Sequence, residues 1–335
     1  MAIIKQAVLH IYDSNTGQAV LSEQGLDLTI EDIQKYIEAM IEKVSTSFKR
    51  KQGNFKGEES SFKALKATET DFIGQSQQLT QQLTEIMAHN PDIPPADWLW
   101  TLFLLEDGDT YLGAFKLNHN TFYTHFVNYE EEHLQNELIL HRSILPSPKQ
   151  AIDEGLVVNL KTGHYYLIEK KHVLEEKGQS CEYFSGLFLK ISPQASVSEA
   201  IKEIKKAVEA TAKSFDDPVY DSLAKAKEIL YHEMSQEEGF SNERMADQLY
   251  KDNVGKKTTY MEKMSKVDLS ELEDGQDASL IPNKMQRQKL KLSNGIELTI
   301  PLDLFYDPNV VEWINNPDGT LSVHLKNIES IRNLF

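Results

Sequence analysis

The sequence has little of what marks secreted or membrane proteins. It contains one cysteine, Cys181, among 335 residues, which excludes a disulfide framework or a cysteine-based zinc site and fits a reducing cytoplasm. No apolar run approaches the roughly 20 residues needed to span a bilayer. The start, MAIIKQAVLHIYDSN, lacks the apolar segment and cleavage site of a signal peptide. We therefore expect a cytoplasmic protein with no membrane partner.

Short motifs of catalytic and nucleotide-binding sites are also missing. The chain has no GxxxxGK[ST], no GxGxxG after a strand, no GxSxG and no HExxH, the strings that signal P-loops, dinucleotide sites, serine hydrolases and zinc proteases. Its ten histidines are scattered along the chain. The motifs thus give no reason to assign a catalytic residue, a metal ligand or a cofactor.

Positive charge is in the minority. The chain has 35 Lys and Arg against 52 Asp and Glu, for a net charge of -17. Phosphates repel a surface of this sign, which argues against DNA wrapping around the whole molecule. DNA binding would have to use a local basic face.

The length and the order of patterns predict an α+β protein of two domains. Residues 1–195 are expected to form an N-terminal domain with a mixed or antiparallel sheet and flanking helices. Pro193 and the small polar residues around it suggest the boundary. Residues 196–335 are expected to form a helical domain that ends in a small antiparallel β-meander.

Apolar periodicity locates the main elements of the N-terminal part. A strand is expected over residues 2–12, and an amphipathic helix ends near Phe48. The pattern of residues 134–145 fits a helix as well as a strand. That of residues 180–191 fits a buried helical turn or a strand. Two hairpins are predicted, 98–105 with 111–117 and 156–160 with 165–168.

The C-terminal part reads as helices followed by strands. Spacings of three and four residues predict helices over 197–212, 219–230 and 241–250. Near the end, two alternating runs flank Asn294-Gly295, a pair typical of a type I′ hairpin turn because both central residues need φ > 0. A second turn at residues 316–319 leads into the alternating run 321–325.

Two groups of basic residues are candidates for DNA contact. The first, the loop cluster, is Lys49, Arg50, Lys51 and Lys56, in a stretch that also holds Phe48, Phe55 and Phe62. Basic and aromatic side chains in a glycine-containing loop suit phosphate contact with occasional base stacking. The competing interpretation is a solvated loop whose phenylalanines anchor it to the core.

The second group, the strand cluster, is Lys284, Arg287, Lys289 and Lys291, which has no acidic residue between its members. Lys289 and Lys291 alternate with Leu290 and Leu292, so one face of the expected strand packs while the other presents its cations. Such contacts position a protein on DNA without reading its sequence.

One constellation suggests a different chemistry. Asp153 and the run Glu169-Lys170-Lys171 lie close to two paired strands, as in nucleases that hold a divalent metal with an Asp and a Glu-x-Lys motif. A metal-dependent nuclease using Asp153, Glu169 and Lys171 is therefore one alternative. A charged strand end at the surface is the simpler interpretation.

The succession of segments resembles the bacterial nucleoid-associated protein family of the NdpA/YejK type. The resemblance is carried by GIELTIPLDLFYDPN and NPDGTLSVHLKNI, with support from IYDSNTG, from residues 58–63 and from SCEYFSGLFLK. It implies a non-enzymatic cytoplasmic protein that associates with the nucleoid and binds DNA, and it carries over no catalytic residue.

The acidic net charge shapes what we expect of the partners. DNA binding should be weak or sequence-nonspecific, or supplied by a chromosome-associated protein that this chain contacts as an adaptor. Homo-oligomerisation is left open.

Overall fold

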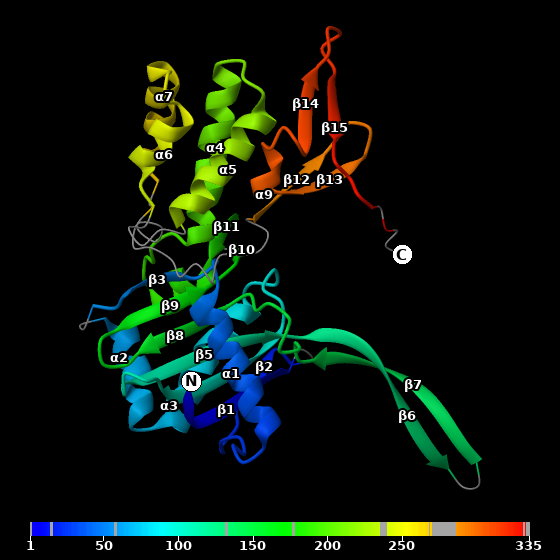
Figure 1. The fold of residues 1–335 in the computed structure, drawn as a ribbon. Coiled ribbons are helices and arrows are strands. Elements are labelled where there is room, and N and C mark those ends of the chain that lie inside the picture. The colour runs from blue at the N-terminus through cyan, green and yellow to red at the C-terminus, as the bar shows by residue number, and fades with distance from the viewer. Residues whose placement is uncertain are drawn as a thin grey trace. The chain divides into compact units, whose positions relative to one another are not determined.

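The computed structural model describes residues 2–13, 16–56, 59–130, 133–175, 178–234, 240–267, 269, 286–330 and 332. The chain divides into two compact units, Met1–Val197 and Ser198–Phe335. We describe each unit by itself (Figure 1). The α+β class is confirmed, with an antiparallel sheet, then helices, then small strand pairs. The predicted domain boundary near residue 195 stays a prediction.

A seven-stranded sheet forms the centre of the first unit. Its order is β2-β1-β4-β5-β8-β9-β3, and every neighbouring pair is antiparallel. The two predicted hairpins form its middle. The strands are β1 (Ile3–Asp13), β2 (Gln18–Val20), β3 (Lys51–Asn54), β4 (Ala96–Leu104), β5 (Thr110–Asn118), β8 (Gly155–Asn159) and β9 (His164–Ile168).

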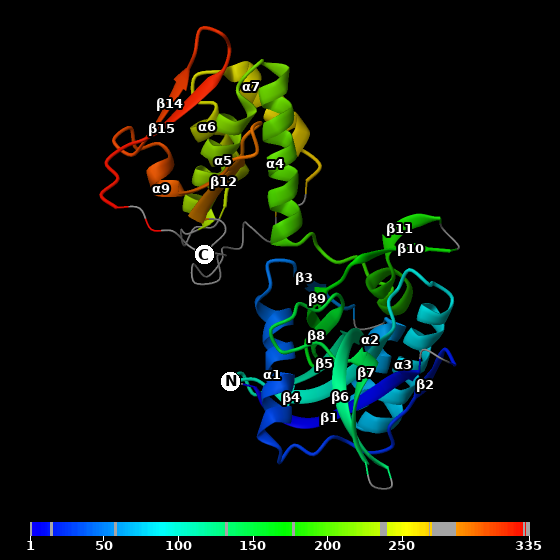
Figure 2. The same ribbon diagram turned by 90° about the vertical axis from the view of Figure 1, so that its right-hand side faces the viewer.

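Helices cover both faces of this sheet, as Figure 2 shows. Alternation along β4 directs Leu99 and Phe103 toward α1 (Glu31–Thr46), and Trp98 and Trp100 toward the opposite face. That opposite face packs against α2 (Ser60–Lys66), the 3-10 turn η1 (Ala67–Glu69), α3 (Phe72–Ala88) and the π-helical turn η2 (Phe184–Leu189). Burial on both faces explains the continuously apolar sequence of the central strands.

Two further hairpins belong to the first unit. β6 (Asn120–Glu130) pairs with β7 (His133–Ile144), so the ambiguous stretch is a strand. β10 (Lys171–Leu174) pairs with β11 (Gln179–Glu182), which runs into η2. The segment over 180–191 is thus partly strand and partly helical turn.

The helices of the second unit are α4 (Val197–Ser214), α5 (Val219–Met234), α6 (Asn242–Leu249) and α7 (Val254–Met264). Side-chain caps begin two of them: Ser241 Oγ accepts from the Arg244 amide, and Asn253 Oδ1 accepts from the Lys256 amide. In the described part of the chain, no helix combines the length and the apolar character required to cross a bilayer.

The expected C-terminal strands form two separate hairpins. β12 (Arg287–Lys291) pairs with β13 (Glu297–Pro301), and β14 (Val311–Asn315) with β15 (Leu321–Leu325), with the helical turn α9 (Leu302–Phe305) between them. A small core joins them to α5 through Ala224, Ile300, Phe305 and Val311.

The turn between β12 and β13 differs from the predicted type I′. Only Gly295, with φ of 88°, is left-handed there, and Asn294 is not. The Gly295 amide donates to the carbonyl oxygen of Leu292 at 3.0 Å. A longer loop with one left-handed residue replaces the two-residue turn, and glycine meets that single requirement.

Candidate nucleic-acid interface

The loop cluster follows directly on helix α1. The helix ends at Thr46, and Ser47 Oγ accepts from the Lys49 amide at 3.1 Å, which turns the chain toward β3. β3 is the edge strand beside β9. Lys49 and Lys56 are exposed on either side of this strand.

The other two cations of the loop cluster are held by the protein itself. The Arg50 guanidinium lies 4.5 Å from the centre of the Tyr166 ring and donates to the carbonyl oxygen of Ser45. Lys51 Nζ lies 3.0 Å from Glu169 Oε1 and 3.3 Å from Glu182 Oε1, and its side chain is only 12% exposed. Lys51 is therefore neutralised by two carboxylates.

The phenylalanines of this stretch are structural. Phe55 and Phe62 are buried, and their rings stack with centroids 5.3 Å apart. Phe55 also packs on Tyr165 at 4.9 Å. These two rings anchor the segment to the core, as the competing interpretation expected, and cannot stack on bases.

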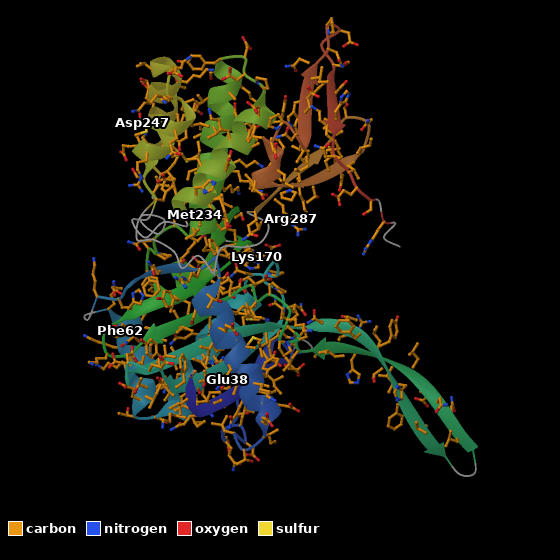
Figure 3. The ribbon with its side chains drawn as sticks, in the orientation of Figure 1. Glu38, Phe62, Lys170, Met234, Asp247 and Arg287 are labelled. Carbon is orange, nitrogen blue, oxygen red and sulfur yellow. The ribbon has the colours of Figure 1, made fainter. Side chains whose placement is uncertain are left out.

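The strand cluster is open to solvent in its described part. Arg287, which Figure 3 labels, and Lys289 and Lys291 alternate along β12 and are all exposed. Lys291 Nζ lies 3.8 Å from Glu297 Oε1 across the hairpin, a solvent-exposed pair that contributes little. Lys284 lies outside the described residues.

A groove of about 800 Å³ runs beside this strand. Much of its lining is apolar, with side chains from α4, α5 and β12 such as Ile204, Leu223 and Leu290. Five basic residues also line it: Lys205, Lys227, Arg287, Lys289 and Lys291. A lining of apolar and basic side chains suits an amphipathic acidic segment as well as a phosphate chain.

Each of the three residues of the nuclease alternative lies beside a side chain of opposite charge. Asp153 Oδ2 accepts from Asn118 Nδ2 at 2.8 Å and lies 3.5 Å from Lys170 Nζ. Glu169, with its side chain 1% exposed, binds Lys51 and accepts from the backbone amide of Ser185. Lys171 Nζ lies 3.5 Å from Glu182. Over the residues described, no group of three His, Cys, Asp or Glu is placed to hold a metal ion.

The structure also contains a buried ionic cluster that the sequence analysis missed. Lys116 Nζ on β5 lies 3.0 Å from Glu154 Oε2, and both side chains are fully buried. His172 Nε2 lies 2.8 Å from the other oxygen of Glu154, and the Tyr183 ring packs beside both Lys116 and His172. Burial lowers the pKa of Lys116, and the Glu154 carboxylate opposes that shift. A lysine inside the apolar run YLGAFKL was the available signal.

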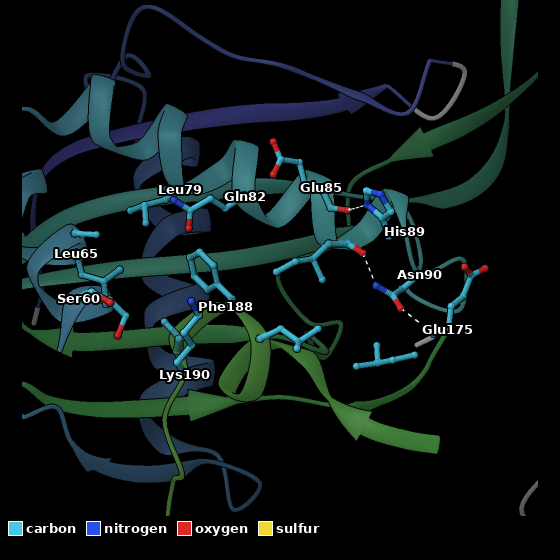
Figure 4. A pocket seen from close by; sticks show the side chains of 16 residues that line it. Ser60, Leu65, Leu79, Gln82, Glu85, His89, Asn90, Glu175, Phe188 and Lys190 are labelled. Atoms are coloured by element: carbon cyan, nitrogen blue, oxygen red, sulfur yellow. Dashed lines mark hydrogen bonds between the residues drawn. The ribbon is translucent and has the colours of Figure 1, made fainter. Parts of the chain in front are cut away.

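A second hollow, of about 820 Å³, lies between α2, α3 and η2 (Figure 4). Two of its polar side chains bond to the backbone. Asn90 Nδ2 donates to the carbonyl oxygen of Ile86 and its Oδ1 accepts from the Glu175 amide, while His89 Nδ1 lies 2.7 Å from the carbonyl oxygen of Glu85. Among the described residues that line it, Lys190 and His89 are the only basic ones. This lining does not suit a nucleic-acid backbone.

Comparison with protein families gives one match. Residues 8–332 match the family described as nucleoid-associated protein YejK. No curated protein matches the chain. The match includes nearly all of both compact units, so it concerns the whole architecture and not one domain.

Proposed function

The chain belongs to the nucleoid-associated protein YejK family, and we propose that it binds DNA directly and without catalysis, through basic side chains that contact phosphates. Nucleoid association is the property that the family name carries. Direct DNA contact, its non-enzymatic character and the residues involved are our proposal. Binding of this kind is insensitive to base sequence and falls steeply with salt.

The observation that supports the proposal best is the exposed row of cations on β12. Arg287, Lys289 and Lys291 project from alternate positions of one strand, and among the described residues only Lys291 faces a carboxylate, at 3.8 Å. Lys205 and Lys227 line the same groove. A local positive surface of this size can attract phosphates although the chain carries a net charge of -17.

The test is a salt titration of DNA binding by the full chain. We expect charge reversal of Arg287, Lys289 and Lys291 to Glu to weaken binding on every duplex sequence alike. The slope of log affinity against log salt should fall by up to about 3, because each phosphate contact contributes about 0.9.

A matched control reverses three exposed lysines outside both clusters, Lys35, Lys206 and Lys213. It changes the net charge by the same amount. Equal loss of binding in the two triple variants would mean that only overall charge matters, and unchanged binding of the β12 variant would remove this surface from the interface.

A second candidate function is an adaptor that reaches the nucleoid through a protein partner. The groove between α4, α5 and β12 supports it, because much of its lining is apolar while DNA backbones present only charge and sugar to a protein surface. Leu223→Glu would place a carboxylate in that lining and should weaken binding of a protein partner there. If purified protein fails to bind DNA even at low salt, the adaptor replaces direct binding as the function.

A further inference from the structure

The groove beside β12 is lined by side chains of two kinds. α4, α5 and β12 together contribute seven aliphatic residues, one tyrosine, one glutamine and the five basic residues named above. No Asp or Glu occurs among the described residues of this lining. The groove is thus a concave surface of positive sign on a chain whose net charge is -17. Such a surface selects for an acidic partner.

α5 supplies the longest apolar row of the groove. Val219, Leu223, Ala226 and Leu230 follow one another at spacings of four, three and four residues, so they share one face of the helix. The row is about 17 Å long at ~1.5 Å per residue, or about three helical turns. Val219 and Leu223 are only half-buried, so they offer apolar surface to a partner.

The ligands that fit a basic groove differ in how they use this row. A phosphate chain binds the cations but stabilises neither Leu223 nor Leu290, because apolar side chains gain only when apolar groups take the place of water. An amphipathic helix has apolar residues at i, i+3, i+4 and i+7 and acidic residues on its flanks, so it uses both kinds of side chain. It is a rod about 10–12 Å across, which enters a groove as a flat lipid surface does not.

The dimensions of the groove suit one face of such a helix. A cylinder about 10 Å across and about 17 Å long occupies roughly 1,300 Å³, whereas the groove holds about 800 Å³. The groove therefore encloses part of the helix and leaves the rest in solvent. This division matches an amphipathic helix, whose polar face remains hydrated.

We propose that the groove between α4, α5 and β12 binds an acidic amphipathic helix of a partner protein, and that this helix and DNA exclude each other there. The exclusion rests on the proposed function, since it requires that Arg287, Lys289 and Lys291 contact phosphates. The helix places its apolar stripe against Leu223 and Leu290 and its carboxylates beside the cations. By linkage, each ligand weakens the binding of the other by the same factor.

A synthetic peptide tests the groove without DNA. The probe is a fluorescein-labelled peptide of about 15 residues, with leucines at i, i+3, i+4 and i+7 spacing and glutamates between them. One control peptide has the same residues in an order that gives no apolar stripe, and the other has lysine in place of each glutamate. In fluorescence anisotropy with the full chain, we expect only the probe to bind. No binding of the probe, or equal binding of either control, overturns the proposal.

Uncharged substitutions locate the binding site. Leu223→Gln on α5 and Ile201→Gln on α4 should each weaken binding of the probe about tenfold. Neither changes the charge, so DNA affinity should stay as in wild type. Leu292→Gln is the matched control, because this half-buried leucine follows β12 outside the lining. Circular dichroism checks that each variant keeps its helices, and equal weakening in all three folded variants would contradict the groove as the site.

Competition tests the exclusion. Unlabelled probe peptide should release a labelled duplex from the full chain, and the peptide without an apolar stripe should release much less. Lys289→Gln should weaken the binding of both ligands, because both use its charge. DNA that stays bound while the peptide occupies the groove overturns the exclusion. A chain that binds no DNA refutes the proposed function instead, and the anisotropy measurement still decides whether the groove binds the helix.

Discussion

β3 and β12 are both edge strands that carry basic side chains, but their surroundings differ. Lys51 on β3 lies between Glu169 and Glu182 at 3.0 and 3.3 Å, within the first unit. On β12, Lys289 and Arg287 face solvent beside a groove that contains further lysines. A basic side chain can thus serve as an internal counterion or as part of a surface that binds a partner. Which of the two it does depends on the carboxylates that the fold brings close to it.

This difference separates stability from binding. Removing an internal counterion leaves a buried carboxylate without its partner, so the cost appears in folding. Removing an exposed cation costs little stability and changes the affinity for an anionic partner instead. The following substitutions test whether the two regions divide in this way.

The largest effect is expected at the fully buried pair of the first unit. Lys116→Ala removes the cation beside the fully buried Glu154 and leaves His172 as its remaining side-chain partner among the described residues. We expect unfolding to become easier by about 3–5 kcal/mol. Urea unfolding measures this loss. In a Trp313→Phe background, the fluorescence of the buried Trp98 and Trp100 reports on the first unit alone.

Replacing both partners at once supplies the control. Lys116→Met with Glu154→Leu removes the two charges together, so most of the stability should return. If the single and double variants are equally unstable, the loss comes from packing around β5 and not from an unpaired charge.

A smaller loss of stability is expected at Lys51, where a buried and an exposed lysine of the loop cluster can be compared. Lys51→Ala removes the counterion of Glu169, whose side chain is 1% exposed, and should cost about 2 kcal/mol. Lys49→Ala, two residues away and exposed, should stay within about 0.5 kcal/mol of wild type. Similar losses of stability for both variants would mean that Lys51 and Lys49 do not differ in their contribution to folding.

The stabilisation by Lys51 also depends on pH. Burial acts to raise the pKa of Glu182, but Lys51 and Lys171 outweigh it and hold that pKa below its ordinary value of 4.5. A lowered folded-state pKa contributes stability that is present above the unfolded-state value and lost as pH falls through the folded-state value. The difference in unfolding free energy between wild type and Lys51→Ala should therefore become smaller below about pH 4.5.

Local pattern carried much of the fold prediction. Period-2 alternation located the β4–β5 and β12–β13 hairpins, and Ser241 marked the start of α6, because these signals depend on neighbouring residues. Residues 134–145 could not be assigned, since Leu134, Leu138 and His141 fit helical spacing while Leu138 and Leu140 fit a strand. The long pairing with β6 decided the matter.

The candidate site was harder to predict for a physical reason. The carboxylates that neutralise Lys51 lie 118 and 131 residues further along the chain. Nothing in the local run around Lys51 indicates that they fold onto it. Contacts of this separation depend on the sheet order, in which β3 pairs with β9 at the edge.

The smallest effect is expected when the exposed members of the loop cluster are tested for DNA binding. Lys49→Gln with Lys56→Gln removes two exposed cations and leaves Lys51 and its carboxylates in place. If both cations contact phosphate, the salt slope should fall by about 1.8, with equal weakening on all sequences.

We expect the salt slope to fall by less than about 1.8. The loop cluster presents two exposed lysines to DNA, because its other two cations are held by Tyr166, Glu169 and Glu182. Lys35→Gln with Lys213→Gln is the charge-matched control. A loss larger than that of the β12 triple variant would reverse the comparison, and it would make the edge of the seven-stranded sheet the main DNA surface despite its internal ion pairs.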